Sequence, residues 1–250
     1  MRIKKIFLLI FFTFIVGSTF QNKDITIFLA GDSTIAEKLL EKRPETGWGE
    51  KIGIFFSENI KIKNHAKNGR STKSFINEGR WQAIMDSVSK GDYVFIQFGH
   101  NDQSITKGER YTHPIDFKNN YRKFVIETRS RDAIPVLITP VMRRRFNENG
   151  TFYDVHGIYP DLIRQVAKEM NVALIDLSKS SEDLFIKLGE KETEKIFLIL
   201  KPGDSPNYPE GKDDNTHFND HGAEVIAKLV ADDIKKSNLD LRHYFNKLEN

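Results

Sequence analysis

From residue 25 onward, short and almost continuously apolar runs alternate with segments of helical pattern. This alternation limits the possible folds more than any other feature of the sequence. The apolar runs fall at 25–30, 60–64, 93–98, 135–139 and 173–176. Runs of this length and character are typical of strands in a parallel sheet that is covered on both faces. The segments between and after them predict helices at 48–57, 74–89, 116–131, 159–170 and 180–188.

A last amphipathic helix is indicated near the C-terminus, where one helical face carries Ala223, Ile226, Ala227, Val230 and Ile234. Repeated alternation of strand and helix predicts an α/β fold with three layers, in which helices cover both faces of the sheet. The sequence contains no internal repeat, low-complexity tract or linker to a second domain. We therefore expect residues 21–250 to form a single domain.

Two polar stretches do not fit the alternation. Residues 143–157 are polar and basic, and residues 201–214 contain three prolines and two glycines. The second stretch is long for a simple connection, so we expect it to be a functional loop.

The N-terminus has the order of charges and apolar residues that is typical of a secretory signal peptide. Arg2, Lys4 and Lys5 precede an apolar run at 6–16, and small residues follow the run. The run is shorter than the roughly 20 residues that span a bilayer. We expect residues 1–20 to be removed on export to a periplasm or to the cell exterior, which leaves a mature chain without a membrane anchor. The chain contains no cysteine, so its fold relies on its core and not on disulfides.

The overall charge gives no indication of nucleic-acid binding. The 38 basic residues are spread along the chain and exceed the 35 acidic residues by only three. A local basic cleft for an anionic substrate is compatible with this balance.

Ser33 follows the first apolar run, within the tripeptide Gly31-Asp32-Ser33. In an open parallel sheet, sites form at the carboxyl ends of the strands, where Ser33, Gly69 and Asn101 are expected to fall. Taken alone, the tripeptide favours a simpler interpretation, in which one of its polar residues caps a helix. A nucleophilic role for Ser33 therefore requires a base and hydrogen-bond donors from other segments of the chain.

His217 is the best candidate for a base. Asp214 precedes it by three residues in a predicted loop, close enough to accept a hydrogen bond from the imidazole and to fix its tautomer. The alternative is an exposed pair before a helix cap. A metal site formed by His217 and His221 beside Asp220 is not expected, because a helix that begins near Asp220 would not place both histidines on one face.

Two further segments offer hydrogen-bond donors for a negatively charged oxygen. The side-chain amide of Asn101 can donate, and the absence of a side chain at Gly69 lets its backbone N–H approach a substrate. Together with the N–H of Ser33, they would form an oxyanion hole. The alternative is ordinary turns, since Asn-Gly and Asn-Asp are common turn dipeptides. Four such segments in register with strand ends favour a catalytic site.

The motifs and their order resemble those of the SGNH (GDSL-type) hydrolases, and within them the rhamnogalacturonan acetylesterase group. The matching segments cover nearly the whole expected mature chain and lie at 29–36, 47–50, 68–75, 78–80, 91–102 and 214–217. The resemblance implies a flavodoxin-like fold whose five parallel strands have the order 2-1-3-4-5. It also implies ester hydrolysis through an acyl-enzyme, without a cofactor or a metal.

The resemblance assigns the roles residue by residue. Ser33 is the expected nucleophile, His217 the base and Asp214 the residue that orients it. Gly69 and Asn101 join the Ser33 N–H in the oxyanion hole.

For the substrate, the resemblance implies an acetylated pectin backbone such as rhamnogalacturonan. Guanidinium groups bind carboxylates well, so the candidates to bind uronates are Arg70, Arg80, Arg143, Arg144 and Arg145. The alternative is that these arginines only solubilise the surface or bond to backbone carbonyls. The segments 103–111 and 143–157 match the family less closely, and we expect them to set the fit of the substrate. The expected partner is an acetylated, uronate-containing polysaccharide or oligosaccharide, bound by a monomer.

Three alternatives use many of the same features. A GDSL-type lipase or thioesterase would need an apolar acyl groove, whereas the variable segments are polar and basic. An acetyl-xylan esterase would use the same catalytic residues. A non-catalytic carbohydrate-binding protein would have no need of Ser33 or His217.

Overall fold

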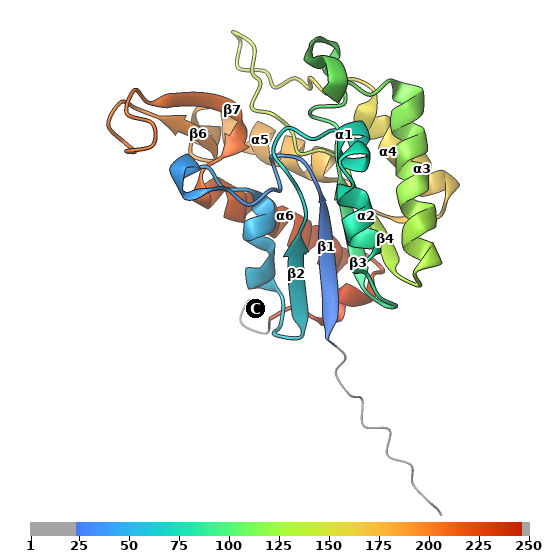
Figure 1. Ribbon diagram of the computed structural model, residues 1–250. Helices are drawn as coiled ribbons and strands as arrows, with labels where there is room; N and C mark the ends of the chain where they lie inside the picture. The colour runs from blue at the N-terminus through green and yellow to red at the C-terminus, as the bar shows by residue number, and fades with distance from the viewer. Residues whose placement is uncertain (1–23, 247–250) are drawn as a thin grey trace, which may run out of the picture.

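The computed structural model describes residues 24–246. The predicted signal peptide lies outside the described residues. The centre of the molecule is a five-stranded parallel sheet with the strand order β2-β1-β3-β4-β5 (Figure 1). Its strands are β1 (Ile25–Gly31), β2 (Ile60–Asn64), β3 (Tyr93–Gln97), β4 (Ile134–Ile138) and β5 (Ala173–Ile175). This sheet confirms the predicted flavodoxin-like topology.

The side chains of each central strand alternate between two hydrophobic cores. In β1, Ile27 and Leu29 belong to the core on one face of the sheet, whereas Phe28 and Ala30 belong to the core on the other. All four side chains are fully buried. Because both faces are covered, the strand has no polar face, and this explains why the sequence shows continuous apolar runs.

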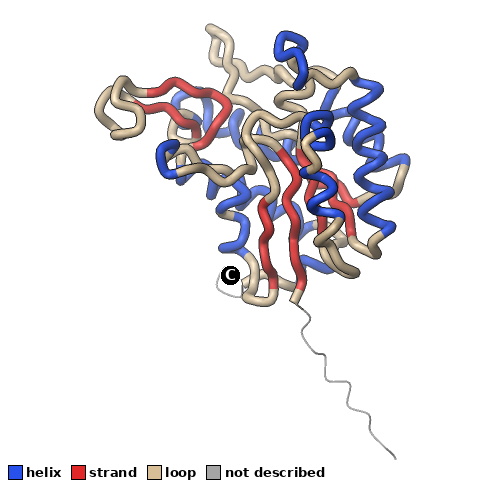
Figure 2. The backbone as a smooth tube through the Cα atoms, in the orientation of Figure 1, coloured by secondary structure: helices blue, strands red, loops and turns tan. Residues whose placement is uncertain are grey.

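Helices form the two outer layers (Figures 1 and 2). Buried side chains assign four helices to one core, namely α1 (Thr72–Asn77), α2 (Arg80–Met85), α3 (Pro114–Ser130) and α4 (Tyr159–Glu169). The other core contains side chains of α5 (Leu177–Thr193), α6 (Asp220–Lys236) and the short 3-10 helices η2 (Trp48–Glu50) and η3 (Ile52–Phe55). Within residues 24–246, none of the helices has both the length and the apolar character that a membrane span requires.

Two predicted helices differ from the structure. The segment predicted as a helix at 48–57 forms the two 3-10 turns η2 and η3. The helix predicted at 74–89 is divided into α1 and α2, because Gly79 between them has a φ of 70°. This left-handed conformation ends one helix and redirects the chain into the next, and glycine adopts it without steric cost.

The segment predicted as a long functional loop at 201–214 is largely the end of a hairpin. Strands β6 (Phe197–Leu200) and β7 (Lys212–Phe218) pair antiparallel beside the main sheet, and residues 201–211 connect them (Figure 1). The pairing is irregular, since Phe197 faces Phe218 whereas the next residue, Leu198, faces Asp214. Residues 215–217 therefore form a bulge in β7. The sequence did not predict β7, because Phe218 is its only buried residue and the strand therefore has no apolar pattern.

Candidate active site

Ser33 lies in a turn directly after β1. The turn is closed by the backbone of Asp32, whose carbonyl accepts from the Ala36 N–H at 3.1 Å. The Asp32 carboxylate also accepts from the N–H of Thr34 at 2.9 Å and from its hydroxyl at 2.8 Å. Among the described residues no helix begins at this turn, because the next helical element is the short 3-10 helix at Leu40–Lys42. The expected helix cap is therefore not formed; the Asp32 side chain stabilises the turn, and the Ser33 hydroxyl takes no part in it.

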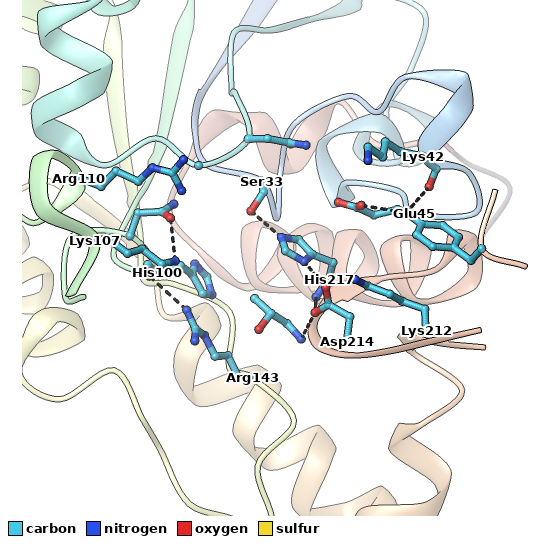
Figure 3. Close-up of a pocket in the computed structure, with 15 residues that line it drawn as sticks. Ser33, Lys42, Glu45, His100, Lys107, Arg110, Arg143, Lys212, Asp214 and His217 are labelled. Atoms are coloured by element: carbon cyan, nitrogen blue, oxygen red, sulfur yellow. Dashed lines mark hydrogen bonds and ion pairs between the residues drawn. The ribbon is translucent and has the colours of Figure 1, made fainter. Parts of the chain in front are cut away.

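Three side chains form a continuous hydrogen-bonded chain at this turn (Figure 3). Ser33 Oγ lies 2.8 Å from His217 Nε2, and His217 Nδ1 lies 2.8 Å from Asp214 Oδ2. Because the Asp214 carboxylate can only accept, the ring carries a proton on Nδ1 and presents the lone pair of Nε2 to the serine hydroxyl. A nucleophile and its base require this arrangement.

The bulge in β7 brings Asp214 and His217 together. In a regular strand, residues three positions apart point to opposite faces of the sheet. Here Asp214 Oδ1 accepts from the backbone N–H groups of Thr216 at 2.9 Å and His217 at 3.1 Å. These bonds fold the backbone back on the carboxylate, so that the imidazole reaches the other oxygen. Asp214 and His217 therefore lie in a bulged strand and not in the loop that the sequence suggested.

Asp214 is held in its ionised form. Burial alone would raise the pKa of its carboxyl group, but hydrogen bonds from the His217 ring and from two backbone N–H groups outweigh burial and hold the pKa well below its ordinary value. A permanent negative charge thus faces Nδ1, where it stabilises the positive charge that His217 gains on taking a proton.

Ser33 opens into a cavity of about 490 Å³ at the carboxyl ends of β1 and β3. Gly69 and Asn101 line the same cavity, together with Asp214 and His217. Among the described residues, the backbone N–H groups of Ser33 and Gly69 have no acceptor. All five residues predicted for the catalytic site and the oxyanion hole are therefore brought to one cavity.

Two features of the structure favour glycine at position 69. Its φ is 78°, which disfavours any residue with a side chain. A Cβ atom at this position would also lie 3.1 Å from Cζ of Arg110, so the guanidinium group packs against the bare glycine. A cationic side chain that the sequence did not single out is thus placed beside Gly69.

The Asn101 amide is fixed from both sides. Its Nδ2 donates to the carbonyl of Arg70 at 3.0 Å, and its Oδ1 accepts from Lys107 Nζ at 3.3 Å. The first bond uses one N–H of the amide, and the second fixes which end of the amide carries the donors. One N–H of Asn101 remains available to a ligand.

A buried ion pair lies beneath the serine turn. His100 Nδ1 lies 3.0 Å from Asp32 Oδ2, and His100 Nε2 lies 2.9 Å from the carbonyl of Val141. Both ring nitrogens thus face oxygen atoms of neighbouring segments. Burial would raise the pKa of Asp32, but the charge and hydrogen bond of His100, with bonds from Thr34, lower it to about 2. The pair ties the serine turn to the segment that carries Asn101.

A buried lysine links the serine turn to the Gly69 segment. The side chain of Lys38 is fully buried. Its Nζ donates to the Ser33 carbonyl at 2.5 Å, to Asn68 Oδ1 at 2.8 Å and to Glu45 Oε1 at 2.8 Å. The ammonium group thereby holds the residue before Gly69 at a fixed position relative to the serine.

Of the five arginines predicted to bind substrate, Arg143 lines the cavity, and the other four are not among its lining residues. Arg70 and Arg80 share the Glu78 carboxylate, at 3.0 Å and 2.7 Å.

The two arginines after Arg143 serve other contacts. Arg144 donates to Asn215 Oδ1 at 2.9 Å and to Glu194 Oε1 at 3.0 Å, so it braces the bulge of β7. Arg145 accepts through its carbonyl from the Tyr153 N–H at 3.0 Å.

The cavity contains cations that sequence reasoning missed. Lys107 and Arg110 come from the 3-10 helix η4 (Ile105–Arg110) and lie with Arg143 on one side of Ser33, whereas Lys42 and Lys212 lie on the other (Figure 3). η4 falls inside the segment 103–111. The weak match of this segment to the family was the only sequence signal for Lys107 and Arg110. The cavity carboxylates, Glu45 and Asp214, are already paired with Lys38 and His217, so the rim has an excess of positive charge.

The residues considered for a metal are separated by the fold. His217 lies in β7 and His221 in α6, which begins at Asp220 after the Asn219 cap. Across residues 24–246, no group of three or more histidine, cysteine, aspartate and glutamate side chains is placed to hold a metal ion.

Residues 29–225 match the model of the GDSL-like Lipase/Acylhydrolase family. The rhamnogalacturonan acetylesterase RhgT of Bacillus subtilis (strain 168) is 44% identical over 224 residues, which are 90% of this chain and 95% of that protein. The probable rhamnogalacturonan acetylesterase YesY of the same organism is 41% identical over 216 residues, 86% of this chain and 94% of that protein.

A solved structure shares the fold. The crystal structure of YxiM from Bacillus subtilis superimposes with a TM-score of 0.74 at 25% identity. The match covers 87% of this chain but only 58% of the YxiM chain.

Proposed function

The chain belongs to the GDSL-like Lipase/Acylhydrolase family, and we propose that it is a serine esterase that removes O-acetyl groups from acetylated rhamnogalacturonan or a related pectin. The observation that carries this proposal is the hydrogen-bonded chain from Ser33 through His217 to Asp214, at the floor of a cavity with a cationic rim. Two relatives named for rhamnogalacturonan acetylesterase activity match almost the full length of the chain, which supports the same substrate class.

The reaction follows from the hydrogen-bond pattern. The Ser33 oxygen attacks the acetyl carbonyl while His217 Nε2 takes its proton, and Asp214 stabilises the imidazolium. The tetrahedral intermediate collapses, the sugar oxygen leaves with the proton from His217, and the acetyl group stays on Ser33. Water then attacks the acyl-enzyme while His217 Nε2 takes its proton, and acetate is released as the Ser33 oxygen leaves and takes that proton back from His217.

Three donors would stabilise the oxyanion. They are the N–H groups of Ser33 and Gly69, which have no acceptor in the described part of the chain, and the remaining N–H of Asn101. Loss of one such donor typically costs about 2.7–4 kcal/mol of transition-state stabilisation. Lys107, which fixes the Asn101 amide, acts on this reaction as a positioning residue.

The charge of the cavity favours an anionic polysaccharide. Five lysines and arginines line the cavity, whereas its two carboxylates are paired internally. A uronate carboxylate would find a counter-charge there, and a long acyl chain would meet charged side chains in place of an apolar groove. We propose that Arg143, Lys107 and Arg110 are the nearest contacts for such a carboxylate.

We also propose that the protein acts outside the cytoplasm as a monomer. Residues 1–20 have the order of a signal peptide, and a polymeric pectin has to be met where it occurs. In this proposal residues 21–250 are the mature, single catalytic domain. Mass spectrometry of the exported protein would identify its N-terminus, and a mature chain that still begins at Met1 would contradict the proposal.

An esterase assay with the purified mature protein tests the function. The substrates would be acetylated rhamnogalacturonan, acetylated homogalacturonan, acetyl-xylan and p-nitrophenyl esters of increasing chain length, with acetate release measured for each. We expect the highest kcat/KM on acetylated rhamnogalacturonan and no turnover with Ser33→Ala. A preference for octanoate over acetate would refute the sugar-acetate function, and acetyl-xylan as the best substrate would refute the pectin assignment.

A further inference from the structure

Asp102 is a buried carboxyl group that the proposed reaction does not use. It directly follows Asn101, and its side chain is fully buried. Its Oδ1 accepts from the Thr72 N–H at 2.9 Å and from the Thr72 hydroxyl at 2.6 Å. Both bonds cross from the segment after β3 to the first residue of α1.

Asp102 and its neighbour hold the same segment at two points. Asn101 Nδ2 donates to the carbonyl of Arg70, the residue after Gly69. Asp102 binds Thr72, two residues further along. A single bond would let the segment turn about it, whereas two bonds fix both its distance and its direction. The position of the Gly69 N–H relative to the Asn101 amide therefore depends on Asp102.

The Thr72 hydroxyl is itself oriented by a helix of the outer layer. Asn120 of α3 donates from Nδ2 to Thr72 Oγ1 at 3.0 Å, so the hydroxyl proton is left for Asp102. The backbone carbonyl of Asp102 accepts from the Thr112 N–H at 3.0 Å, just before α3. Asp102 thus joins the two oxyanion segments to the start of α3.

The second oxygen of the carboxyl group has no partner. Oδ2 of Asp102 is buried and makes no hydrogen bond within residues 24–246. An ionised carboxylate at this position would leave part of its charge without a donor, at a high cost in free energy. A carboxylic acid with its proton on Oδ2 avoids the buried charge, and its Oδ1 still accepts both bonds from Thr72.

The surroundings of Asp102 also favour the neutral acid. Asp32 of the serine turn, Tyr121 of α3 and Tyr159 of α4 act on it from the elements packed around it, and none of these three groups brings a positive charge. Burial, with the like charge of Asp32, raises the pKa of Asp102 to about 7, although the bonds from Thr72 oppose the shift. The proton is therefore retained through the weakly acidic range.

We propose that Asp102 is a positioning residue for the oxyanion hole, and that it acts as a neutral carboxylic acid that fixes the segment of Gly69 relative to Asn101. The inference rests on the proposed function, because it assumes that these two donors stabilise an oxyanion. Loss of the proton would place a buried negative charge behind the donors. That charge opposes the negative charge that develops on the substrate oxygen, so the neutral form is the active one.

The test uses a matched pair of variants, Asp102→Asn and Asp102→Leu. Both replacements have nearly the size of aspartate. The asparagine cannot ionise and keeps an acceptor for Thr72, whereas the leucine offers no acceptor. Thr72→Val removes the hydroxyl donor alone, and it decides the question if thermal melts show that Asp102→Leu is unfolded. Each variant is assayed on p-nitrophenyl acetate, so the result does not depend on the identity of the polysaccharide.

We expect Asp102→Leu to lower kcat at pH 6 by about 10–100-fold and Thr72→Val by about 3–10-fold, with KM within about twofold of the wild type. Asp102→Asn should stay within about threefold of the wild type. Unchanged kcat in folded Asp102→Leu, or in Thr72→Val, would overturn the positioning role. An Asp102→Asn protein as slow as Asp102→Leu would overturn the neutral acid.

The pH dependence supplies a measurement that a purely structural role would not change. The ratio of kcat for Asp102→Asn to kcat for the wild type cancels the titration of His217, which both proteins share. This ratio should rise by roughly 3–10-fold between pH 6 and pH 8, because the wild type ionises at position 102 and the variant does not. A ratio that stays constant would overturn the proposal.

Thermal melts separate this inference from the proposed function. The pKa of Asp102 is about 7 in the folded state against an ordinary value of 3.8, so the folded wild type loses stability as the pH rises from 3.8 through 7. Asp102→Asn does not share this loss, and its Tm should rise relative to that of the wild type between pH 5 and pH 8. This result would support the neutral acid even if no ester were hydrolysed. A constant difference in Tm would refute it, even if the protein proves to be an acetylesterase.

Discussion

The Lys38 ammonium group offers the sharpest test of how the site is held together. In Lys38→Met, three acceptors lose their donor, and the Glu45 carboxylate, only 11% exposed, loses its counter-charge. Removing one partner of a buried ion pair typically destabilises a protein by about 3–5 kcal/mol. Total stabilities are about 5–15 kcal/mol. For a domain of this size the loss corresponds to a decrease in Tm of about 6–20 °C.

The same substitution should slow catalysis. Lys38 holds the Ser33 carbonyl and the Asn68 side chain, and Asn68 directly precedes Gly69. Without the ammonium group two oxyanion donors lose their fixed separation, although neither is removed. We therefore expect kcat to fall by about 10–100-fold, less than the 10²–10³-fold typical of removing a donor. KM should change little, because the loss concerns the transition state.

A double-mutant cycle measures the interaction energy between Lys38 and Glu45. Glu45→Gln removes the negative partner, and Lys38→Met/Glu45→Gln removes both. Urea unfolding of the four proteins should show that the double variant is more stable than the sum of the single losses predicts, with a coupling of about 1–3 kcal/mol. Additive losses, or a Lys38→Met protein that loses less than about 1 kcal/mol and keeps full turnover, would refute the reasoning.

Three further predictions follow from the site. The folded-state pKa of Asp32 is about 2 against an ordinary value of 3.8, so its ionisation contributes stability that is present above pH 3.8 and lost as the pH falls through 2. The free energy of unfolding measured with urea should thus be lower for Asp32→Asn than for the wild type at neutral pH, and this difference should shrink below about pH 4. A difference that stays constant with pH would contradict the prediction. His217→Ala should lower kcat on p-nitrophenyl acetate by roughly 10⁴–10⁶-fold, and Asp214→Ala by less, because the aspartate orients and does not exchange the proton; an equal or greater loss with Asp214→Ala would be inconsistent. Gly69→Ala and Gly79→Ala, at φ of 78° and 70°, should each lose about 1–2 kcal/mol of stability, yet only Gly69→Ala, whose methyl meets a guanidinium group, should also slow turnover.

The sheet could be predicted from the sequence because its central strands β1, β3 and β4 are largely buried on both faces. In β3 all five residues are buried, and four of the five, all except Gln97, form a continuous apolar run. The position of Ser33 followed directly, since it comes next after such a run. β7 gave no comparable signal, because only its last residue is buried and its pairing with β6 is interrupted by a bulge.

The cations that line the cavity could not be predicted because their positions depend on tertiary packing. Lys107 and Arg143 are 36 positions apart, and neither belongs to a motif with a fixed spacing. The same holds for Lys38, whose burial is unusual for a lysine and depends on acceptors from three separate segments. Arg143, the one of the five candidate arginines that lines the cavity, could not be told apart by sequence from Arg144, which braces β7 instead.

The hairpin that carries the proposed base makes the activity depend on a part of the fold outside the main sheet. His217 and Ser33 are 184 positions apart, and the β6–β7 pair is a two-stranded ribbon outside the main sheet. Such a ribbon is marginally stable alone, and here its inner end is held by the buried rings of Phe197 and Phe218. If the ribbon opens locally, Ser33 loses its base while the five-stranded sheet keeps its hydrogen bonds. A polysaccharide that contacts Lys212 on the ribbon while its ester lies at Ser33 would oppose such an opening, because it binds only the closed form.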